Sequence, residues 1–251
     1  MKVAILGKFL KSEPSHYITK LISLLKKREV SVFLEKEYYN QLKELLPENI
    51  NSFTKLDKSY DLLISIGGDG TILKAITFVK HLSIPIVGIN SGRLGFLAKI
   101  KIDKIEEAID EIISGNYSIS ERSLIEVITS EKNNELSKLN FALNEIAVSR
   151  KNTTSMISIE TKLDDNYLNS YWADGLIIAT PTGSTGYSLS CGGPIIMPEA
   201  ENLVITPIAP HNLNARPLII ADSTEISLMI NGRENEFLIS LDSRITTLSN
   251  T

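Results

Sequence analysis

The sequence predicts an α/β plus all-β protein: an N-terminal doubly wound, Rossmann-like α/β domain followed by a β-rich, antiparallel, sandwich-like domain. Over about the first 115 of the 251 residues, short apolar runs alternate with amphipathic helical patterns. That strict alternation favours parallel strands joined by crossover helices. Beyond about residue 117 the apolar segments are short and separated by turn residues, which favours antiparallel strands. We therefore expect domains of residues 1–117 and 118–251.

The elements of the first domain follow from hydrophobic periodicity. Runs of four to six apolar residues predict buried strands, and apolar residues recurring every three or four positions predict amphipathic helices. The expected strands are 3–6, 30–34, 62–66 and 84–89. The expected helices are 17–27, 38–46 ended by Pro47, 71–81, and 103–113 with Gly115 as its stop.

The second domain is expected to consist mainly of strands. They are predicted at residues 124–129, 140–149, 156–163, 175–179, 203–207, 225–230 and 237–241. Turn signals at Asn133-Asn134, at residues 164–166 and at Asn231-Gly232 separate them. One short helix is expected near residues 186–190.

Composition and charge narrow the class of protein. Hydrophobic residues make up 43% and charged residues 22%, which is typical of a globular chain, and no apolar run is long enough to cross a bilayer. The formal charge of −4 argues against a nucleic-acid partner, which would require a basic face. The single cysteine, Cys191, cannot form an internal disulfide and favours a reducing cytoplasm. Residues 3–6 favour a first strand over a signal peptide, because the apolar stretch is too short.

The third expected strand runs into a glycine-rich turn, Gly67-Gly68-Asp69-Gly70-Thr71, which a helix follows. Three glycines in four residues allow a sharp turn and let a ligand approach without a Cβ in its way. The N-terminus of the following helix offers free N–H groups and the positive end of its dipole. Because open α/β sheets bind ligands beyond the carboxyl ends of their strands, the turn predicts a phosphate site.

Asp69 has two interpretations. A carboxylate beside phosphates is repelled unless a metal or a reacting hydroxyl compensates, which indicates a general base or a magnesium contact. Alternatively Asp69 caps the helix, since Asp is a favoured N-cap residue, although Thr71 could cap it instead. The turn lacks the alternating glycines of the dinucleotide fingerprint, which disfavours a generic Rossmann dehydrogenase.

Two segments of the second domain combine polar side chains with turns. Asn144-Glu145 interrupts an apolar strand, and adjacent strand residues point to opposite faces, so at least one should face the interior or a site. A strand end that satisfies its own turn is the alternative. Residues 173–194 form a buried strand and then a loop of small hydroxyl residues and glycines, which suits phosphates and ribose, although a surface turn is possible. Cys191 has no cationic neighbour in sequence, so we expect a small packed residue rather than a nucleophile.

Taken together, these motifs resemble those of the NAD kinases. Residues 67–71 are similar to the GGDGT signature that NAD kinases share with lipid kinases of the diacylglycerol and sphingosine type and, more loosely, with phosphofructokinases. Asn144-Glu145 resembles the Asn-Glu pair of NAD kinases. Residues 173–194 resemble their second signature, and residues 210–217 their His-x-Leu-x-x-Arg-Pro stretch. Lipid kinases share only the first motif, so the set indicates the bacterial NAD kinases.

The resemblance implies transfer of the γ-phosphoryl group of ATP to the 2′-hydroxyl of the adenosine ribose of NAD, in an active site between the two domains. Asp69 would accept the proton, and Mg²⁺ or another divalent cation would arrive with ATP. Gly67, Gly68 and Thr71 would form the phosphate loop, and His211 would stand at the active centre or be structural. The residues implied to bind NAD are Asp69, Gly70, Lys74, Asn144, Glu145, Trp172, Asp174, Thr185, Gly186, Tyr187, Ser188, Ser190 and Arg244.

Several expectations qualify this resemblance. Arg244 stands where relatives often have a glutamine that reaches NAD, which puts its side-chain contact in doubt. The alternative interpretation of Lys74 is a solvated lysine on a helix surface, and that of Trp172 is a core residue. Relatives continue for some tens of residues beyond Asp242-Ser243, whereas this sequence stops at Thr251, so we expect the closing element either to be absent or to have been trimmed from the sequence. The partners would be NAD and ATP in a homodimer or homotetramer, without nucleic acid or membrane. The rival functions are a kinase for lipids or sugars and a catalytically silent NAD(P)-binding sensor.

Overall fold

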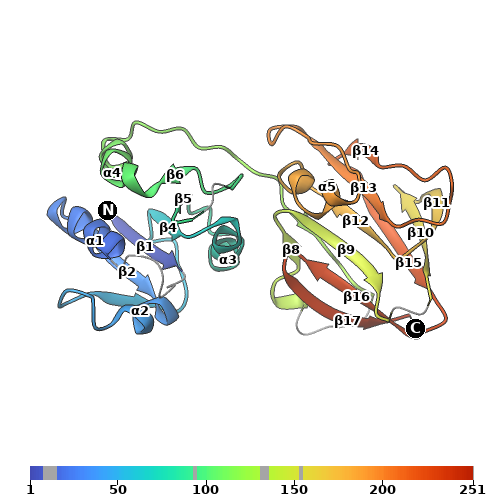
Figure 1. The fold of residues 1–251 in the computed structure, drawn as a ribbon, viewed down its shortest axis with the longest axis horizontal. Coiled ribbons are helices and arrows are strands. Elements are labelled where there is room, and N and C mark those ends of the chain that lie inside the picture. The colour runs from blue at the N-terminus through green and yellow to red at the C-terminus, as the bar shows by residue number, and fades with distance from the viewer. Residues whose placement is uncertain (8–15, 93–94, 131–135, 153–154, 251) are drawn as a thin grey trace. The chain divides into compact units, whose positions relative to one another are not determined.

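The computed structural model describes residues 1–7, 16–92, 95–130, 136–152 and 155–250. The chain forms two compact units, Met1–Ile119 and Ser120–Thr251, each with its own hydrophobic core (Figure 1). The sequence places the change of pattern near residue 117. The expected turn at Asn133-Asn134 lies outside the described residues. No helix in the described part of the chain is long and apolar enough to cross a membrane.

Unit 1 is built on a six-stranded parallel sheet with the strand order β3-β2-β1-β4-β5-β6. Consecutive strands run outward in one direction from β1 and in the other from β4, so the order reverses between them and forms a topological switch point. The short β3 and β6, which form the two edges, were not expected from the sequence. The strands are β1 (Lys2–Gly7), β2 (Ser31–Glu35), β3 (Asn51–Phe53), β4 (Leu62–Ile66), β5 (Ile86–Asn90) and β6 (Ile100–Lys101).

Helices cover both faces of this sheet, which confirms the doubly wound α/β class. The alternation of side chains along β1 explains this arrangement, since Val3 and Ile5 pack in one core and Ala4 and Leu6 in another. The first core contains the apolar faces of α1, α2 and α4, and the second that of α3. The helices are α1 (His16–Lys27), α2 (Lys36–Leu42), α3 (Asp69–Val79) and α4 (Ile105–Ser114), which follows a 3₁₀ turn, η1 (Ile102–Lys104).

Local caps decide where two of these helices begin or end. The α2 helix begins two residues earlier than expected, because the Glu35 carboxylate accepts the N–H groups of Glu37 and Tyr38 at 3.1 and 3.0 Å. It also ends at Leu42, before the Pro47 that the sequence indicated as its stop. Gly115 ends α4 as expected, with a left-handed φ of 78°.

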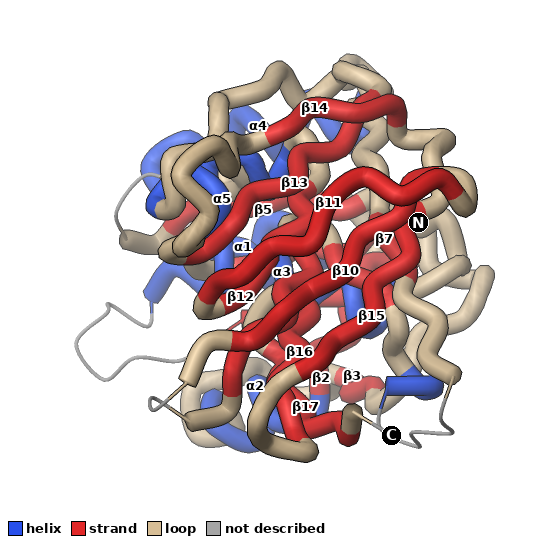
Figure 2. Tube along the Cα trace, turned by 90° about the vertical axis from the view of Figure 1, so that its right-hand side faces the viewer, coloured by secondary structure: helices blue, strands red, loops and turns tan. Residues whose placement is uncertain are grey.

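Unit 2 contains two larger antiparallel sheets, which confirms the β-rich second half. One has the order β14-β13-β12-β9-β16-β17. The other has the order β11-β10-β15, and its three strands lie side by side in Figure 2. A third, two-stranded sheet pairs β7 with β8. The strands are β7 (Ile125–Glu126), β8 (Phe141–Ala142), β9 (Glu145–Arg150), β10 (Ile157–Leu163), β11 (Asn166–Ala173), β12 (Gly175–Ala179), β13 (Asn202–Ile208), β14 (Leu218–Ala221), β15 (Ile226–Asn231), β16 (Glu236–Leu241) and β17 (Arg244–Ser249).

The central strands of the six-stranded sheet of unit 2 are buried on both faces. Ile146, Val148 and Ile178 on one face pack in a core with Ile159 of β10 and Tyr171 of β11, as in a sandwich. Ala147 and Ile177 on the other face pack with Cys191, which follows the short helices η3 (Thr182–Thr185) and α5 (Tyr187–Ser190). The expected short helix near residues 186–190 is therefore present. The 3₁₀ turn η2 (Leu136–Lys138) precedes β8.

Candidate functional site

The glycine turn joins β4 to α3 as the sequence predicts. Gly67 adopts a φ of 149°, a conformation that favours glycine, and its N–H donates to the Ile89 carbonyl at 2.9 Å. A Cβ on Gly67 would overlap the Thr71 side chain, whereas a Cβ on Gly68 or Gly70 would meet no protein atom within 4 Å. Packing therefore explains Gly67, and the open space around Gly68 and Gly70 is available to a ligand.

Asp69 does not cap the helix that follows this turn. The N-cap position is Gly68, without a side-chain cap, and α3 begins at Asp69 itself. The Asp69 carboxylate instead accepts three consecutive backbone N–H groups, from Phe96 at 2.8 Å, Leu97 at 3.0 Å and Ala98 at 3.1 Å. The helix-cap interpretation is therefore wrong for both Asp69 and Thr71.

The segment that holds Asp69 was missed from the sequence. A Cβ on Gly95 would overlap the Asp69 carboxylate, so only glycine lets this backbone approach so closely. Asn90, at the end of β5, supports the same loop, since its side-chain amide accepts the Gly92 N–H at 2.8 Å and donates to the Ala98 carbonyl at 3.3 Å. The two glycines between β5 and β6 were the available signal, although they do not identify Asp69 as their partner.

A cavity of about 550 Å³ opens beside the glycine turn. Gly7 ends β1 and Gly68 follows β4, so this cavity lies at the carboxyl ends of the two strands that flank the switch point. The N-terminus of α3 lies at the same place, and the N-terminus of a helix favours an anion because its N–H groups and its dipole point outward. The cavity is lined by Gly7, Glu37, Gln41, Gly68, Gly70, Thr71 and Lys74.

Lys74 lies in the wall of this cavity, but its ammonium group has carboxylate partners. Its Nζ is 2.8 Å from the Glu37 carboxylate and 4.0 Å from that of Glu35. The hydrogen bond and charge of Lys74 lower the pKa of Glu37. Both side chains are largely exposed, so the pair is weak and an anionic ligand can replace Glu37 as the partner of Lys74.

In unit 2 the Asn144-Glu145 pair lies at a break between two strands, and Glu145 is the first residue of the second. The continuous strand expected over residues 140–149 is therefore wrong, and the alternative interpretation of a strand end holds. The β8 strand ends at Ala142 and β9 begins at Glu145. Glu145 is only 9% exposed, and its Oε2 atom has no hydrogen-bond partner among the described residues. Burial and the nearby Asp242 charge raise the pKa of the Glu145 carboxyl from 4.5 to about 7, against the lowering effect of the Tyr187 N–H.

The structure brings this pair into contact with the hydroxyl- and glycine-rich loop. A Cβ on Gly183 would overlap the Asn144 backbone, and one on Gly186 would lie 2.9 Å from Glu145 Oε2. Thr180 ties the strand before the loop to the same break, since its N–H donates to the Asn144 carbonyl at 2.8 Å. Two segments that are some forty residues apart in sequence thus form one cluster, which we call the 144–187 cluster.

The other predicted residues of this loop differ in accessibility. Tyr187 and Ser190 are exposed, and Thr185 is half-buried with its hydroxyl donating to the Thr182 carbonyl at 3.3 Å. Ser188 is fully buried and its hydroxyl is bonded to Thr206 at 2.8 Å, so a side-chain contact between Ser188 and a ligand is not available in this structure.

Asp174 and Cys191 lie close to Tyr187. The Asp174 carboxylate forms an ion pair of 3.0 Å with Arg150, and its charge contributes, with burial and Cys191, to a raised pKa of the Tyr187 phenol. Burial also raises the pKa of the Cys191 thiol, although a hydrogen bond with Tyr187 opposes this. The thiol therefore stays neutral near neutral pH, which agrees with a packed residue and not with a nucleophile.

Trp172 on β11 is in contact with His211, which lies between β13 and β14. Their rings lie 5.8 Å apart in an edge-to-face arrangement, and the His211 N–H donates to the Trp172 carbonyl at 2.7 Å. The Asn212 side chain accepts the Trp172 N–H at 2.7 Å, so residues 211–212 cover the edge of this strand. Trp172 is 54% exposed and is therefore not the core residue of the alternative interpretation.

Arg244 binds the backbone of its own unit. Its guanidinium group donates to the Leu139 carbonyl at 2.7 Å and also to the Phe141 carbonyl, and it lies over the Phe141 ring at 5.7 Å. The partners of this side chain in the structure are therefore residues of unit 2. The expected contact between Arg244 and NAD stays a prediction.

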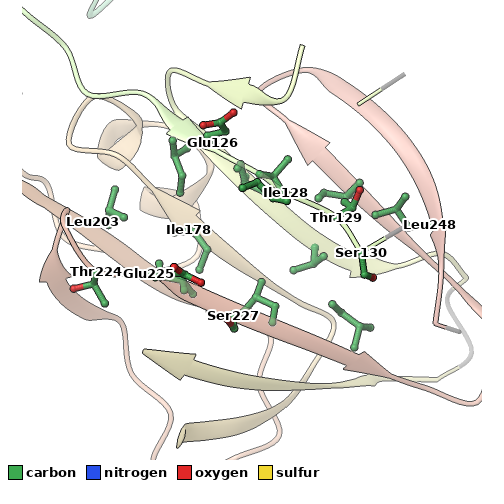
Figure 3. A pocket seen from close by; sticks show the side chains of 18 of the residues that line it. Glu126, Ile128, Thr129, Ser130, Ile178, Leu203, Thr224, Glu225, Ser227 and Leu248 are labelled. Carbon is green, nitrogen blue, oxygen red and sulfur yellow. The ribbon is translucent and has the colours of Figure 1, made fainter. Parts of the chain in front are cut away.

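Another cavity of unit 2 lies away from this cluster and is mostly apolar. Its volume is about 730 Å³, and Figure 3 shows the side chains of Ile178, Leu203 and Leu248 among those that line it, with Glu126 and Glu225 also present. None of the predicted NAD-binding residues lines this cavity. Size alone therefore does not identify the functional site.

A parallel sheet with a phosphate-type turn at its switch point, joined to a β-rich unit with a polar cluster, defines a nucleotide-binding enzyme of two domains. The family profile of the ATP-NAD kinase N-terminal domain matches residues 3–117, and that of the ATP-NAD kinase C-terminal domain matches residues 143–251. The chain belongs to the NAD kinase family.

Individual relatives agree with this assignment. The chain is 54% identical to an NAD kinase of Christiangramia forsetii and 53% identical to one of Flavobacterium psychrophilum, in each case over 100% of this chain and 87% of the relative. It is similar to the crystal structure of yeast NADH kinase complexed with NADH, with a TM-score of 0.85 and 26% identity over 98% of this chain and 76% of that one. It is also similar to an NAD kinase from Archaeoglobus fulgidus in complex with ATP, with a TM-score of 0.76 and 25% identity over 99% and 87% of the two chains.

Proposed function

We propose that this chain transfers the γ-phosphoryl group of ATP to the 2′-hydroxyl of the adenosine ribose of NAD, which yields NADP and ADP. The observation that carries the proposal is the cavity at the glycine turn, where Gly68 and Gly70 leave open space beside the N-terminus of α3 and Asp69. Membership of the NAD kinase family supports NAD as the acceptor.

The residues of unit 1 would act mainly by position and charge. The first N–H groups of α3 would bind phosphate oxygens, and Lys74 would exchange Glu37 for a phosphate. Asp69, whose carboxylate is fixed by three backbone N–H groups, would accept the proton of the ribose hydroxyl. As the oxygen–phosphorus bond to NAD forms, the bond between the β- and γ-phosphates of ATP breaks and ADP leaves.

The divalent cation is proposed to arrive as part of the substrate MgATP. No group of three or more His, Cys, Asp or Glu residues in the described part of the chain could hold a metal by itself. The proposal rests on the chemistry of Mg²⁺, which is commonly held by substrate phosphates together with one or two carboxylates. When bound there, the cation would neutralise charge on the phosphates.

In unit 2, the 144–187 cluster is the proposed site for NAD. Asn144 and Glu145 would hydrogen-bond ribose or amide groups. The Glu145 Oε2 atom, which has no partner within the described part of the chain, supports this role because a buried polar atom without a partner is costly. The exposed Tyr187 ring would stack on a base, and Asp174 would bind a polar end of the dinucleotide. We also propose that the protein forms a homodimer or homotetramer and is located in the cytoplasm.

The test is formation of NADP from NAD, ATP and Mg²⁺, detected with a dehydrogenase that requires NADP, in wild type and Asp69→Asn. Loss of a general base is expected to lower kcat by roughly 10²–10⁴-fold. NAD binding, measured by calorimetry, should persist in Asp69→Asn. The matched control is Asp103→Asn, an exposed aspartate of the same unit, which should leave kcat unchanged.

The outcomes separate the competing functions. Absence of NADP under varied metals and phosphoryl donors would refute the proposal. Phosphorylation of a lipid or sugar would then identify the rival kinase, and NAD(P) binding without turnover would identify the silent sensor. Near-normal kcat in Asp69→Asn, with active wild type, would remove Asp69 from the chemical step and leave the overall reaction intact.

A further inference from the structure

The turn between β16 and β17 holds the break that contains Asn144 and Glu145. Asp242 begins this two-residue turn with a left-handed φ of 53°, and its side chain is only 3% exposed. Its carboxylate accepts the N–H groups of Leu143 at 3.1 Å, Asn144 at 2.8 Å and Glu145 at 3.3 Å. Its own N–H donates to the Glu145 carbonyl at 3.0 Å. Four hydrogen bonds therefore join Asp242 to three consecutive residues.

The neighbouring Arg244 holds the chain just before the break. Its guanidinium group donates to the carbonyls of Leu139 and Phe141, and it lies 4.0 Å from the Asp242 carboxylate. The β16–β17 hairpin thus supplies acceptors to residues 143–145 and donors to residues 139 and 141. This arrangement fixes the backbone on both sides of Ala142, at the point where β8 ends.

An aspartate suits this position for a chemical reason. Three N–H donors converge on one side chain, and an ionised carboxylate is the short side chain that offers only acceptors. An asparagine would present its own NH₂ group to one of the three donors. Aspartate also tolerates the left-handed backbone of the turn better than most residues.

One part of this arrangement opposes stability, namely the proximity of the Asp242 and Glu145 carboxyl groups, which indicates a functional reason for it. The Asp242 charge lies near the buried Glu145 and is one of the causes that raise the pKa of that carboxyl. Two acidic groups buried side by side disfavour ionisation of one of them. A backbone break with fewer charges would be cheaper if its only purpose were to end a strand.

We infer that Asp242 is a positioning residue for NAD, because it fixes the backbone of Asn144 and Glu145 against Gly183 and Gly186. The inference rests on the proposed function, in which Asn144 and Glu145 bind NAD. It assigns Asp242 no contact with the ligand or with ATP. Loss of this side chain should therefore impair binding of NAD selectively.

The test compares Asp242→Asn and Asp242→Gly with wild type. Asp242→Asn is nearly isosteric, keeps one acceptor oxygen and tolerates the left-handed backbone, and we expect it to raise KM for NAD roughly ten-fold. Asp242→Gly also tolerates the backbone but removes all three acceptors, so its effect should be larger. The KM for ATP should change by less than about two-fold in both variants.

Asp164→Asn is the matched control. Asp164 also begins a two-residue hairpin turn of unit 2 with a left-handed φ of 47°, and its carboxylate accepts the Glu225 N–H at 2.9 Å. It shares the backbone geometry and hydrogen-bonding role of Asp242 but lies in the β10–β11 turn. Its substitution should leave both KM values unchanged.

A pH profile adds a readout that loss of stability alone would not change. The groups that face Glu145 are the Asp242 carboxylate and the Tyr187 N–H, and Arg244 faces Asp242. Removal of the Asp242 charge should lower the pKa of Glu145. Ionisation of Glu145 should give KM for NAD an inflection near pH 7 in wild type, and this inflection should move to lower pH in Asp242→Asn and stay in place in Asp164→Asn.

The outcomes distinguish this inference from the proposed function. An unchanged KM for NAD in folded Asp242→Asn would overturn the inference about Asp242. The proposed function would still stand in that case, because it is tested by NADP formation in the wild type. An equal rise of both KM values would overturn it too, because the effect would not be selective. If wild type forms no NADP, the proposed function fails, and calorimetric titration with NAD decides the inference: weaker binding to Asp242→Asn supports it, and equal binding refutes it.

Discussion

Glu145 should make the stability of unit 2 depend on pH, and Glu145→Gln should remove that dependence. Glu145 is 9% exposed, and its pKa is raised from 4.5 to about 7 by burial and by the Asp242 charge. Between these two values the folded state holds a proton that the unfolded state has lost. The free energy of unfolding of the wild type therefore decreases as the pH rises through this window.

The magnitude follows from the two pKa values. One pKa unit corresponds to ~1.36 kcal/mol, so the interval from 4.5 to about 7 corresponds to about 3 kcal/mol. This contribution is fully present below pH 4.5 and lost above about pH 7. A glutamine does not ionise, so the stability of Glu145→Gln relative to wild type should rise by about 3 kcal/mol across this range.

Urea unfolding followed by tryptophan fluorescence measures this effect in unit 2. The chain has one tryptophan, Trp172, which lies on β11 of that unit. Glu201→Gln is the control, because Glu201 is an exposed carboxyl of the same unit. Subtraction of wild-type values at each pH removes the titration of all other groups. A difference between Glu145→Gln and wild type that stays constant from about pH 4 to pH 8 would refute the reasoning.

Two further substitutions test unit 1. Gly95→Ala places a Cβ on the Asp69 carboxylate and should lower kcat by roughly ten-fold or more. Gly92→Ala is the control and should leave kcat near wild type, because a Cβ there meets no protein atom within 4 Å. Equal kcat values of the two variants in the NADP assay would contradict this. Ile64→Ala leaves a cavity at a fully buried position of β4 and should lower the free energy of unfolding by about 3 kcal/mol. Urea unfolding followed by the helical circular-dichroism signal measures this. A decrease in the free energy of unfolding below about 1 kcal/mol would contradict close packing there.

Periodicity was sufficient to predict most of the framework. The runs at β1, β4 and β12 are continuous apolar segments, and the structure buries them on both faces of their sheets. Five strands were missed: β3, β6, β11, β14 and β17. β3 and β6 are only two or three residues long, and β11 mixes polar and aromatic residues without regular alternation, so neither kind carries a clear apolar pattern.

The contacts between distant segments were beyond sequence reasoning. The Asn144-Glu145 pair was predicted as part of a strand, because its apolar neighbours continue the pattern on both sides. The strand breaks there because Asp242, nearly a hundred residues later, accepts the N–H groups that a neighbouring strand would otherwise bind. Hydrogen bonds of this kind depend on tertiary structure and leave no periodic signal.

Asp69 and Asp242 share one physical arrangement, and this affects how the Asp69 variants should be interpreted. Each carboxylate accepts three consecutive backbone N–H groups, those of residues 96–98 and 143–145 respectively. Asp69→Asn therefore removes a proton acceptor and also weakens the attachment of residues 96–98. Gly95→Ala is the useful comparison, because its Cβ displaces the carboxylate and its attachment together but leaves a proton acceptor in the site.

The comparison of these two variants decides what Asp69 contributes. If proton acceptance dominates, Asp69→Asn should lose substantially more kcat than Gly95→Ala, since a base contributes roughly 10²–10⁴-fold and a misplaced group about 10²-fold. Equal losses in the two variants would indicate that the fixed position of residues 96–98 accounts for the whole effect. In that case Asp69 would be a positioning residue, in the same sense that we propose for Asp242.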